Sequence, residues 1–354
     1  MSRLRAGVIG AGSWAQAAHI PALLARPEVE LVAVARRGPE QVAALKERFG
    51  VETASEDYRD VLDAEPDLVV VSSPSAHHLE HAMAALDSGA HVLCEKPMTI
   101  RARDAWQLAE RADQLGLHLV MSFGWNFKPM VERARELVGR HRLGRVESMM
   151  LTMSSQTREL LGGDGTYPDA DPLTTPEPHT WTDPELSGGG YAQAQLSHAL
   201  ALGLGLAGAR VEAAFALTVG ADGSAVEMHD ALALRLDGGG VCSVGGSSAY
   251  TGVDDNQHHL ALEVVAEGGQ LMVDVGRERV SLFTPGHGQV DLDVGPEDGR
   301  YDGQLPVNGL VDLVCGLRDD NPAGGELGAR VTEALELVYR SARSGALEVR
   351  EKHR

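Results

Sequence analysis

Cysteines are scarce in this 354-residue sequence: there are 3 of them, Cys94, Cys242 and Cys315, and they lie far apart. An odd, scattered set provides neither a disulfide framework nor the paired spacing of a zinc site, so we expect no metal. Basic residues are also outnumbered, with 31 Lys and Arg against 51 Asp and Glu and a formal net charge of −20. So much negative charge repels phosphate backbones, which argues against nucleic-acid binding and requires a local structure to hold any nucleotide phosphate.

Long apolar runs are absent as well. No stretch reaches the roughly 18 consecutive apolar residues of a membrane helix. The residues before Gly10 lack the apolar core and the cleavage site of a signal peptide. We therefore expect a cytoplasmic protein that does not attach to membranes. Hydrophobic residues still make up 43% of the chain, a normal share for a globular protein, and the length predicts about two domains.

The first third of the sequence alternates short apolar segments with segments of helical composition. The apolar segments are hydrophobic throughout, which is typical of parallel strands that are covered on both faces. Such an alternation predicts a doubly wound α/β domain. The predicted strands are residues 4–9, 29–35, 68–71, 92–94 and 117–122, and the predicted helices are residues 14–25, 39–49, 76–88 and 101–115.

This alternation ends near residue 123. A long stretch rich in Pro, Gly, Thr and Asp follows at residues 156–187, and the region 211–283 contains several short strands separated by glycine clusters. Strands punctuated in this way indicate an antiparallel meander, so we expect a second, α+β domain on a mostly antiparallel sheet. Its other predicted elements are a strand at 145–154 and helices at 131–138, 191–206 and 329–344.

A glycine-rich turn joins the first predicted strand to the first predicted helix. The turn has a G-x-G-x-x-A pattern, in which Gly10 and Gly12 are the two glycines and Ala15 is the final small residue. Ser13 and Trp14 lie between Gly12 and Ala15. In this setting Gly10 permits the tight turn, Gly12 lets the backbone approach a pyrophosphate, and the helix N-terminus binds the phosphate. We favour a dinucleotide site over the alternative, a glycine turn without a ligand.

The end of the second predicted strand indicates which dinucleotide is bound. NAD-specific sheets place an acidic residue there to bond the ribose 2′-hydroxyl, whereas this chain has Arg36 and Arg37. Guanidinium groups can pair with a 2′-phosphate. We therefore predict NADP(H) as the preferred cofactor, with NAD(H) as the second choice; the alternative is that both arginines are merely solvated.

A third motif, Glu95-Lys96-Pro97, ends another predicted strand of the parallel sheet. The carboxyl ends of such strands form the edge where ligands bind. A lysine fixed there can place its amino group beside a reacting hydroxyl, and Glu95 can orient it; the alternative is a strand that merely ends in a charged lysine.

Together with residues 73–78 and 89–97, these motifs make the chain resemble the Gfo/Idh/MocA oxidoreductase family, the group of glucose–fructose oxidoreductase and inositol dehydrogenase. The resemblance implies a Rossmann domain at residues 1–124. It also implies a second domain at residues 125–354 with a large open sheet, which often forms the interface of a homodimer or homotetramer. Its last helix can pack back on the first domain. The expected reaction is hydride transfer at a sugar, polyol or cyclitol. Lys96 matches the catalytic lysine, and the residues matching the nicotinamide side are Ser73, Pro74 and His78.

The chain departs from the family at one position. After the glycines 188–190 the family has an Asp and, four residues later, a His on the same helix; this sequence keeps His198 but has Ala194 in place of the Asp. Residues four apart share a helix face, so the missing carboxylate would have pointed to the same side as His198. We therefore assign the larger catalytic share to Lys96 and the supporting one to His198, with Gln195 as a polar substrate contact.

Softer substrate candidates lie in two segments near the expected site. Trp125, Asn126 and Lys128 stand at the domain junction, where aromatic residues can instead form interdomain core. His179 and Trp181 precede the glycines, where they can instead anchor the loop. The pair at 258–259 has no acidic or cysteine partner at ligand spacing, which favours surface or interface histidines over a metal site.

Three functions fit these features. The first is an NADP(H)-dependent oxidoreductase acting on a sugar, polyol or cyclitol. The second is an enzyme whose nicotinamide is never released, as in redox-neutral sugar chemistry. The third is a dinucleotide-sensing regulator without catalysis, which Ala194 keeps open and which the retention of Lys96 and His198 argues against.

Overall fold

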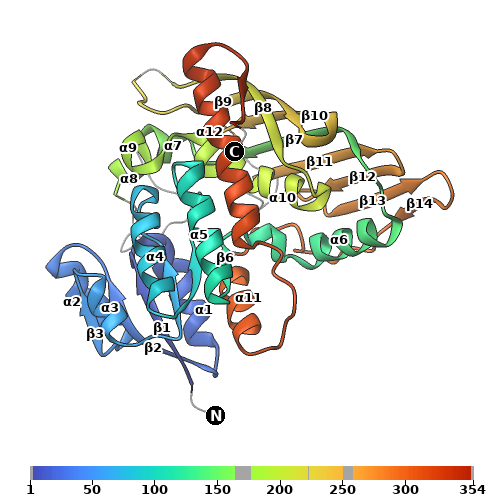
Figure 1. Cartoon of the computed structure of the whole chain (residues 1–354). Helices are drawn as coiled ribbons and strands as arrows, with labels where there is room; N and C mark the ends of the chain where they lie inside the picture. Colours follow the sequence, from blue (N-terminus) through green and yellow to red (C-terminus); the bar gives the residue numbers. More distant parts are fainter. Residues whose placement is uncertain (1–2, 164–176, 222, 250–257, 352–354) are drawn as a thin grey trace.

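The computed structural model describes residues 3–163, 177–221, 223–249 and 258–351. It contains a six-stranded sheet in the first part of the chain and a nine-stranded sheet in the second (Figure 1). Part of the long irregular stretch expected at 156–187 falls outside the described residues. Among the described residues, no helix combines the length and the apolar character needed to cross a bilayer.

The first sheet confirms the doubly wound prediction. Its strands are all parallel, in the order β3-β2-β1-β4-β5-β6, and the order reverses beside β1, where doubly wound sheets bind ligands. The strands are β1 (Leu4–Ile9), β2 (Val29–Ala35), β3 (Thr53–Ser55), β4 (Leu68–Val71), β5 (His91–Cys94) and β6 (Leu119–Met121). The helices are η1 (Ala15–His19, a π-helix), α1 (Ile20–Ala25), α2 (Pro39–Phe49), α3 (Arg59–Asp63), η2 (Ser75–His77, a 3₁₀-helix), α4 (His78–Asp87) and α5 (Ala102–Leu115).

The second sheet has the order β14-β13-β12-β11-β7-β10-β9-β8-β15, with antiparallel neighbours except for the parallel pair β7 and β10. Its strands are β7 (Val146–Ser155), β8 (Val211–Val219), β9 (His229–Leu236), β10 (Val241–Ser247), β11 (His258–Ala266), β12 (Gly269–Asp274), β13 (Arg279–Thr284), β14 (Gly288–Asp291) and β15 (Glu348–Val349). The accompanying helices are η3 (Gly124–Phe127), α6 (Pro129–His141), α7 (Arg158–Gly162), α8 (His179–Thr182), α9 (Pro184–Ser187), η5 (Ala192–Leu196, a π-helix), α10 (Ser197–Ala207), η6 (Asp237–Gly239), α11 (Leu305–Val314) and α12 (Gly325–Ser344).

Helices cover one face of the second sheet: α10 packs on β7 and β11, α12 on β8, and α6 on β13. Strand residues therefore alternate between a buried and an exposed side, as on β9, where Leu232, Leu234 and Leu236 are buried. This alternation decides which side chains can reach the helices and the functional site.

The chain returns from the second sheet to the first through α11 and α12. Gly324 forms a bridge with Val120 of β6, and the Met121 amide donates to the Ala323 carbonyl at 2.7 Å. α12 also packs along α5, beside which it runs in Figure 1. We propose residue 124, where η3 begins, as the boundary between the two domains, with these last helices of the second domain clamping it to the first.

Candidate active site

The glycine-rich turn has the geometry that a dinucleotide requires. Gly10 has a φ of +82°, and a Cβ at this residue would lie 2.3 Å from the Ser73 amide nitrogen, so only glycine fits. A Cβ on Gly12 would meet nothing closer than the Gly10 carbonyl oxygen at 3.9 Å. The space above Gly12 is therefore open to a pyrophosphate, while Ala15 is buried against the sheet and Ser13 and Trp14 are half-buried. The turn fits the cofactor that the sequence predicts.

Arg36 and Arg37 follow the last residue of β2. Arg36 is half-buried and Arg37 is exposed, and among the described residues no ion pair involves either guanidinium. The amide of Gly38, the next residue, donates to Glu56 Oε1 at 2.7 Å, which shapes the loop that carries the two arginines.

His78, which the resemblance assigns to the nicotinamide side, is buried between two turns. The ring is 1% exposed; Nε2 lies 2.7 Å from the Ser73 carbonyl oxygen and Nδ1 lies 3.0 Å from that of Pro97. Burial lowers the pKa of His78, against the opposing effect of these carbonyls. His78 thus ties the turn that carries Ser73 and Pro74 to the turn after Lys96.

Glu95 is fixed by a partner that the sequence did not reveal. His19 Nε2 donates to Glu95 Oε1 at 2.8 Å, and the Lys96 amide donates to Glu95 Oε2 at 3.0 Å. Burial opposes ionisation, but the hydrogen bond and charge of His19, together with the nearby Lys96, outweigh it and lower the pKa of Glu95 to about 2. Glu95 is therefore an anion that holds the backbone beside Lys96.

Lys96 reaches across the domain boundary. Its Nζ donates to the main-chain oxygen of Ala194 at 2.6 Å and lies 5.8 Å from the ring centre of Trp181. Burial lowers the pKa of Lys96, and Glu95 opposes this shift. In this chain the residue that replaces the family's Asp thus contacts the lysine through its backbone.

Two π-helical segments contain the residues that bind Glu95 and Lys96. His19 ends η1 and binds Glu95, whereas Ala194 lies in the middle of η5 and binds Lys96. The helices expected over 14–25 and 191–206 are confirmed, and the structure adds that each begins with a π-helical segment. π-helical turns alter which backbone groups are paired and are frequent at functional sites.

The glycines at 188–190 are required by close packing. A Cβ on Gly189 would lie 2.3 Å from the Tyr339 ring, and one on Gly190 would lie 2.0 Å from the Glu227 carbonyl oxygen. The Glu227 carboxylate accepts hydrogen bonds from the amides of Gly190 and Ala192 and from the Tyr339 hydroxyl, at 2.9, 3.0 and 2.5 Å. This carboxylate fixes the start of the helix that carries Ala194 and the histidine at 198.

His198 lies in a group of rings beside Lys96. Its ring centre is 5.2 Å from that of Trp125 and 5.3 Å from that of Tyr301, and Trp125 also contacts His258 at 5.3 Å. We call Lys96, Trp125, His198, His258 and Tyr301 the Lys96 cluster. Burial and the nearby Lys96 and His258 lower the pKa of His198 well below its usual range, so the ring is neutral at pH 7. Its Nδ1 is buried and has no hydrogen-bond partner among the described residues.

The structure separates the two residues of the histidine pair at 258–259. His258 is directed to the helix side of the sheet, in phase with the buried Leu260, Leu262 and Val264, while His259 is directed to the other side. This phase was readable from the sequence, but we overlooked it. Tyr301 was also missed, because it lies in an irregular segment between β14 and α11 that has no periodic pattern.

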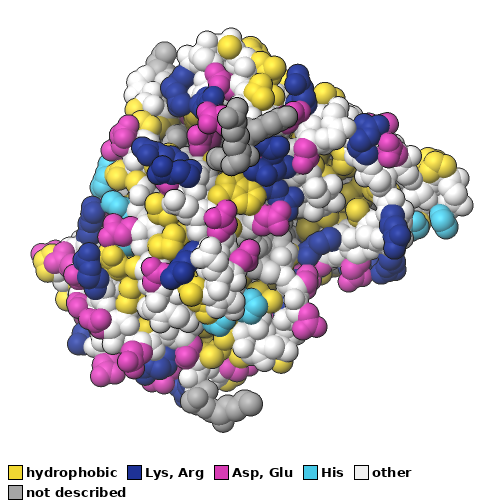
Figure 2. Space-filling view, viewed as in Figure 1, with side chains coloured by type: hydrophobic (Ala, Val, Ile, Leu, Met, Phe, Trp, Pro, Cys, Tyr) yellow, Lys and Arg dark blue, Asp and Glu magenta, His cyan; other side chains and the backbone are white. Residues whose placement is uncertain are grey.

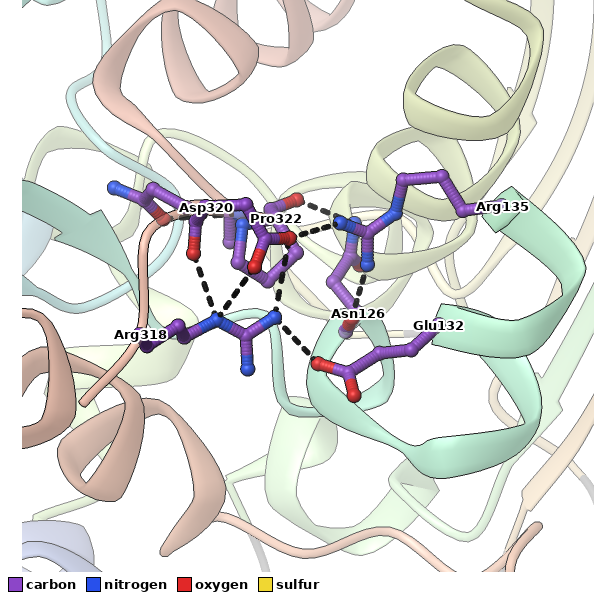
Figure 3. A network of polar contacts seen from close by, with 8 residues as sticks. Asn126, Glu132, Arg135, Arg318, Asp320 and Pro322 are labelled. Carbon is purple, nitrogen blue, oxygen red and sulfur yellow. Dashed lines mark hydrogen bonds and ion pairs between the residues drawn. The ribbon is translucent and has the colours of Figure 1, made fainter. Parts of the chain in front are cut away.

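The side chains of two predicted substrate contacts bond to main-chain oxygens of the protein. Asn126 Nδ2 donates to the carbonyl oxygens of Ala201 and Pro322, and Lys128 Nζ donates to that of Glu297. Figure 3 shows Asn126 within a network that joins α6 to the segment before α12. Its charged members are Glu132, Arg135, Arg318 and Asp320. Both side chains thus bond to main-chain oxygens that are distant in the sequence but within the second domain, and sequence motifs do not report such bonds.

The remaining predicted substrate contacts differ in how deeply they are buried. Trp125 is 2% exposed and its Nε1 donates to the Gly299 carbonyl oxygen at 3.2 Å, so it combines core packing with a place in the Lys96 cluster. Gln195 is buried in η5. His179 is exposed and lies 3.4 Å from Glu177, on the turn of α8 that also carries Trp181.

The surface carries charges of both signs. On the face in Figure 2, acidic and basic side chains are interspersed, so no basic patch stands out there. Within the described ranges, no group of three or more His, Cys, Asp or Glu side chains is placed to hold a metal ion.

Comparisons with known proteins bear on the family and on the fold. Residues 4–123 match the sequence model of an oxidoreductase family with an NAD-binding Rossmann fold, named GFO_IDH_MocA. D-glucoside 3-dehydrogenase of Escherichia coli strain K12 is 34% identical over 53% of this chain and 50% of its own. D-xylose 1-dehydrogenase (NADP(+)) 2 of Haloferax volcanii is 34% identical over 42% and 45%. The chain thus spans about half the length of these curated relatives.

Solved structures are similar to this protein over almost the whole chain, and GenD2 is one example. The crystal structure of GenD2 from gentamicin A biosynthesis, in complex with NAD, has a TM-score of 0.77 and 25% sequence identity. The match covers 99% of this chain and 97% of that one, so it includes both sheets.

Proposed function

We propose, because residues 4–123 match the model of the Gfo/Idh/MocA oxidoreductase family, that this protein is an NADP(H)-preferring oxidoreductase acting on a hydroxyl or carbonyl of a sugar, polyol or cyclitol. The observation that carries this proposal is the position of Lys96. Its amino group lies at the ligand-binding edge of the first sheet and touches the helix of the second domain that carries His198. The relatives named for D-glucoside and D-xylose support a sugar substrate.

Different residues of the chain would bind the cofactor and take part in the reaction. The turn at Gly10 and Gly12 would hold the pyrophosphate, and Arg36 and Arg37 would pair with the 2′-phosphate. The bound nicotinamide would supply the hydride acceptor or donor. A side chain of the protein would then have to accept the proton of the substrate hydroxyl.

Lys96 is the residue suited to that proton. Burial lowers its pKa and so favours the neutral amine, which can accept a proton from a hydroxyl as it is oxidised. The Ala194 oxygen can only accept, so it receives a hydrogen from Nζ and leaves the lone pair of the neutral amine for the substrate. His198, which is neutral, would assist by a hydrogen bond to the substrate hydroxyl.

The test is a fluorescence titration of the purified protein with NADPH and NADH in parallel, followed by a turnover screen with methyl β-D-glucopyranoside, D-xylose, levoglucosan and myo-inositol. We expect tighter NADPH binding and formation of NADPH from NADP⁺ with at least one of these compounds. Product without released NADPH would favour the enzyme that retains its nicotinamide. Binding without any turnover would favour the regulator, and failure of both cofactors to bind would contradict all three functions.

Replacing Ala194 by aspartate tests the role of Lys96 as a base. A carboxylate beside the amino group stabilises its charged form and raises its pKa, so less neutral amine remains at a given pH. We expect the acidic limb of the pH profile of kcat/KM to move to higher pH by about one unit. Ala194→Asn is the matched control and should leave the limb in place. Equal profiles for both variants would contradict a basic role for Lys96.

We further propose that the chain forms homodimers or homotetramers through the open face of the second sheet. A row of mutually paired residues crosses this face from β8 to β13, and it includes the exposed Phe215, Met150 and Met272. Apolar patches of this kind mark association surfaces.

Met150→Lys, in the middle of that row, should weaken self-association at least about tenfold because it buries an unpaired charge. Light scattering coupled to size exclusion measures the effect. Leu24→Lys, an equally exposed apolar residue of the first domain, is the control. A monomeric wild-type protein, or unchanged assembly of the Met150 variant, would exclude this interface.

A further inference from the structure

Two residues from outside the helix bind the first amides of the helix that carries Ala194 and His198. This helix consists of η5 and α10, and the first amides of a helix have no acceptor within it. Glu227, which lies just before β9, and Tyr339 of α12 provide the acceptors. The bound amides are those of Gly190 and Ala192 on the Glu227 carboxylate, Tyr191 on the Glu227 main-chain oxygen, and Gln193 on the Tyr339 hydroxyl, at 2.9, 3.0, 2.9 and 3.2 Å.

Glu227 and Tyr339 also bind each other, and we call the two residues the η5 clamp. The Tyr339 hydroxyl donates its single hydrogen to Glu227 Oε1 at 2.5 Å, so its oxygen accepts from the Gln193 amide. Burial and the charge of Glu227 raise the pKa of Tyr339 well above its usual value. The hydroxyl therefore keeps this hydrogen near neutral pH, and the η5 clamp stays closed.

The η5 clamp lies next to the contact between Lys96 and Ala194. Ala194 follows Gln193 directly, and its amide donates to the Gly190 carbonyl oxygen at 2.9 Å. Its own carbonyl oxygen accepts from Lys96 Nζ at 2.6 Å, so a shift of the first turn of η5 would move this oxygen. Lys96 would stay with the first domain, because its amide is bonded to Glu95.

The helix α12 connects the η5 clamp to the domain that carries Lys96. One turn before Tyr339, Glu336 Oε2 accepts from the Ala102 amide at 2.6 Å. Ala102 begins α5, the helix that follows Lys96 in the chain and along which α12 packs (Figure 1). Residues three apart are neighbours on a helix surface, so one side of α12 binds the starts of both α5 and η5.

On the basis of the proposed function, we propose that Glu227 and Tyr339 are positioning residues for the reaction: they hold η5 where the Ala194 carbonyl oxygen meets the amino group of Lys96. A carbonyl oxygen at this place binds the ammonium form more strongly than the neutral amine. The η5 clamp thereby sets both the ionisation of Lys96 and the direction of its amino group.

Other ionisable groups surround these residues. Asp230, near Glu227, has both carboxylate oxygens buried and without a hydrogen-bond partner among the described residues. Burial and the charge of Glu227 raise the pKa of Asp230 to about 8, so it is neutral at pH 7 and ionises only in alkaline solution. Burial also raises the pKa of Tyr191, which keeps its hydrogen. The groups around Lys96 are the ionised Glu95 and the neutral rings of His198 and His258.

The test is an NMR titration of Lys96 in the wild-type protein, Tyr339→Phe and Glu227→Gln, with lysine labelled at Cε and Nζ. Lys96→Met assigns the signal among those of the four lysines of the chain, of which the others are Lys46, Lys128 and Lys352. We expect the midpoint of the Lys96 titration to move to lower pH by about one unit in both variants, because the ammonium form loses its acceptor. This measurement needs no substrate.

The kinetic consequences follow from the same displacement. With a substrate from the turnover screen, the acidic limb of the pH profile of kcat/KM should move to lower pH together with the titration, and kcat should fall about tenfold. The dissociation constant of NADPH should change less than about threefold. The double variant should be little worse than the worse single variant, since the two side chains act as one unit.

Tyr58→Phe is the matched control. It removes another hydrogen bond from a tyrosine to a glutamate, in the first domain, where the Tyr58 hydroxyl donates to Glu80 at 2.9 Å. It should leave the titration of Lys96 in place. A second control adds Asp230→Asn to both the wild-type protein and Tyr339→Phe, which removes the alkaline ionisation near the η5 clamp and should preserve the difference between them.

The two proposals fail in different ways. An unchanged Lys96 titration in Tyr339→Phe and Glu227→Gln, whatever their melting temperatures, would overturn the inference and leave the proposed function intact. Failure of both variants to fold would show a merely structural role and would overturn it as well. A displaced titration without turnover of any sugar by the wild-type protein would defeat the proposed function, while the effect of the η5 clamp on Lys96 would stand.

Discussion

Lys96→Met is expected to lower kcat about a thousandfold, within the range for loss of a general base. Methionine has nearly the same length as lysine and packs well, but it has no lone pair for the substrate proton and no hydrogen for the Ala194 oxygen. The Gly10 turn and Arg36 are unaffected, so the dissociation constant of NADPH should change less than about threefold. Steady-state kinetics and fluorescence titration measure the two quantities.

Two further variants serve as controls for Lys96→Met. Lys46→Met removes an exposed lysine from α2 and should behave as the wild type. Lys96→Arg keeps a positive charge that cannot be given up near neutral pH, so it should be almost as inactive as Lys96→Met if the neutral amine is the base. Turnover by Lys96→Met equal to that of the wild type would remove the catalytic assignment. High activity of Lys96→Arg would instead indicate that positive charge alone is needed.

Arg36→Asp should weaken NADPH binding about 30-fold, because it removes a charge-assisted bond to the 2′-phosphate and adds a repelling carboxylate. NADH has a 2′-hydroxyl there, which an aspartate can bind, so its affinity should hold or improve. The preference between the cofactors should therefore reverse. Parallel fluorescence titrations with NADPH and NADH measure the ratio.

The charge change itself needs a control, since the protein already carries a net charge of −20. Arg140→Asp alters an exposed arginine of α6 that pairs with Glu136, far along the chain from the glycine turn. It should leave the ratio of the two affinities unchanged. An unchanged ratio in Arg36→Asp would show that the arginine does not select the cofactor.

The sequence was sufficient for the first domain because local rules dominate there. Parallel strands buried on both faces are apolar throughout, and the predicted limits of β1, β2, α2 and β4 coincide with those in the structure. The glycine turn was equally readable, since Gly10 needs a positive φ and close contact with a neighbouring strand. Two short elements of this domain without a strong pattern, β3 and α3, were missed.

The site itself was only partly predictable. The sequence supplied Lys96 and His198, and the structure places both in one cluster. It did not supply His19, which binds Glu95, or Tyr301, because these contacts join segments that are distant in the sequence. His258 was accessible from the alternation of β11, but only once that alternation was given more weight than the absence of metal-ligand spacing.

The sequence by itself determined the order of strands and helices, the dinucleotide turn and the lysine at the strand end, because each depends on neighbouring residues. Tertiary structure decided the partners of those residues. It turned Asn126 and Lys128 toward carbonyl oxygens elsewhere in the second domain, and it directed His258 inward. It also gave Lys96 a main-chain oxygen where the family resemblance implies a carboxylate. The physical reason is that burial and hydrogen-bond satisfaction are properties of packed surfaces, and such surfaces exist only after the two sheets have come together.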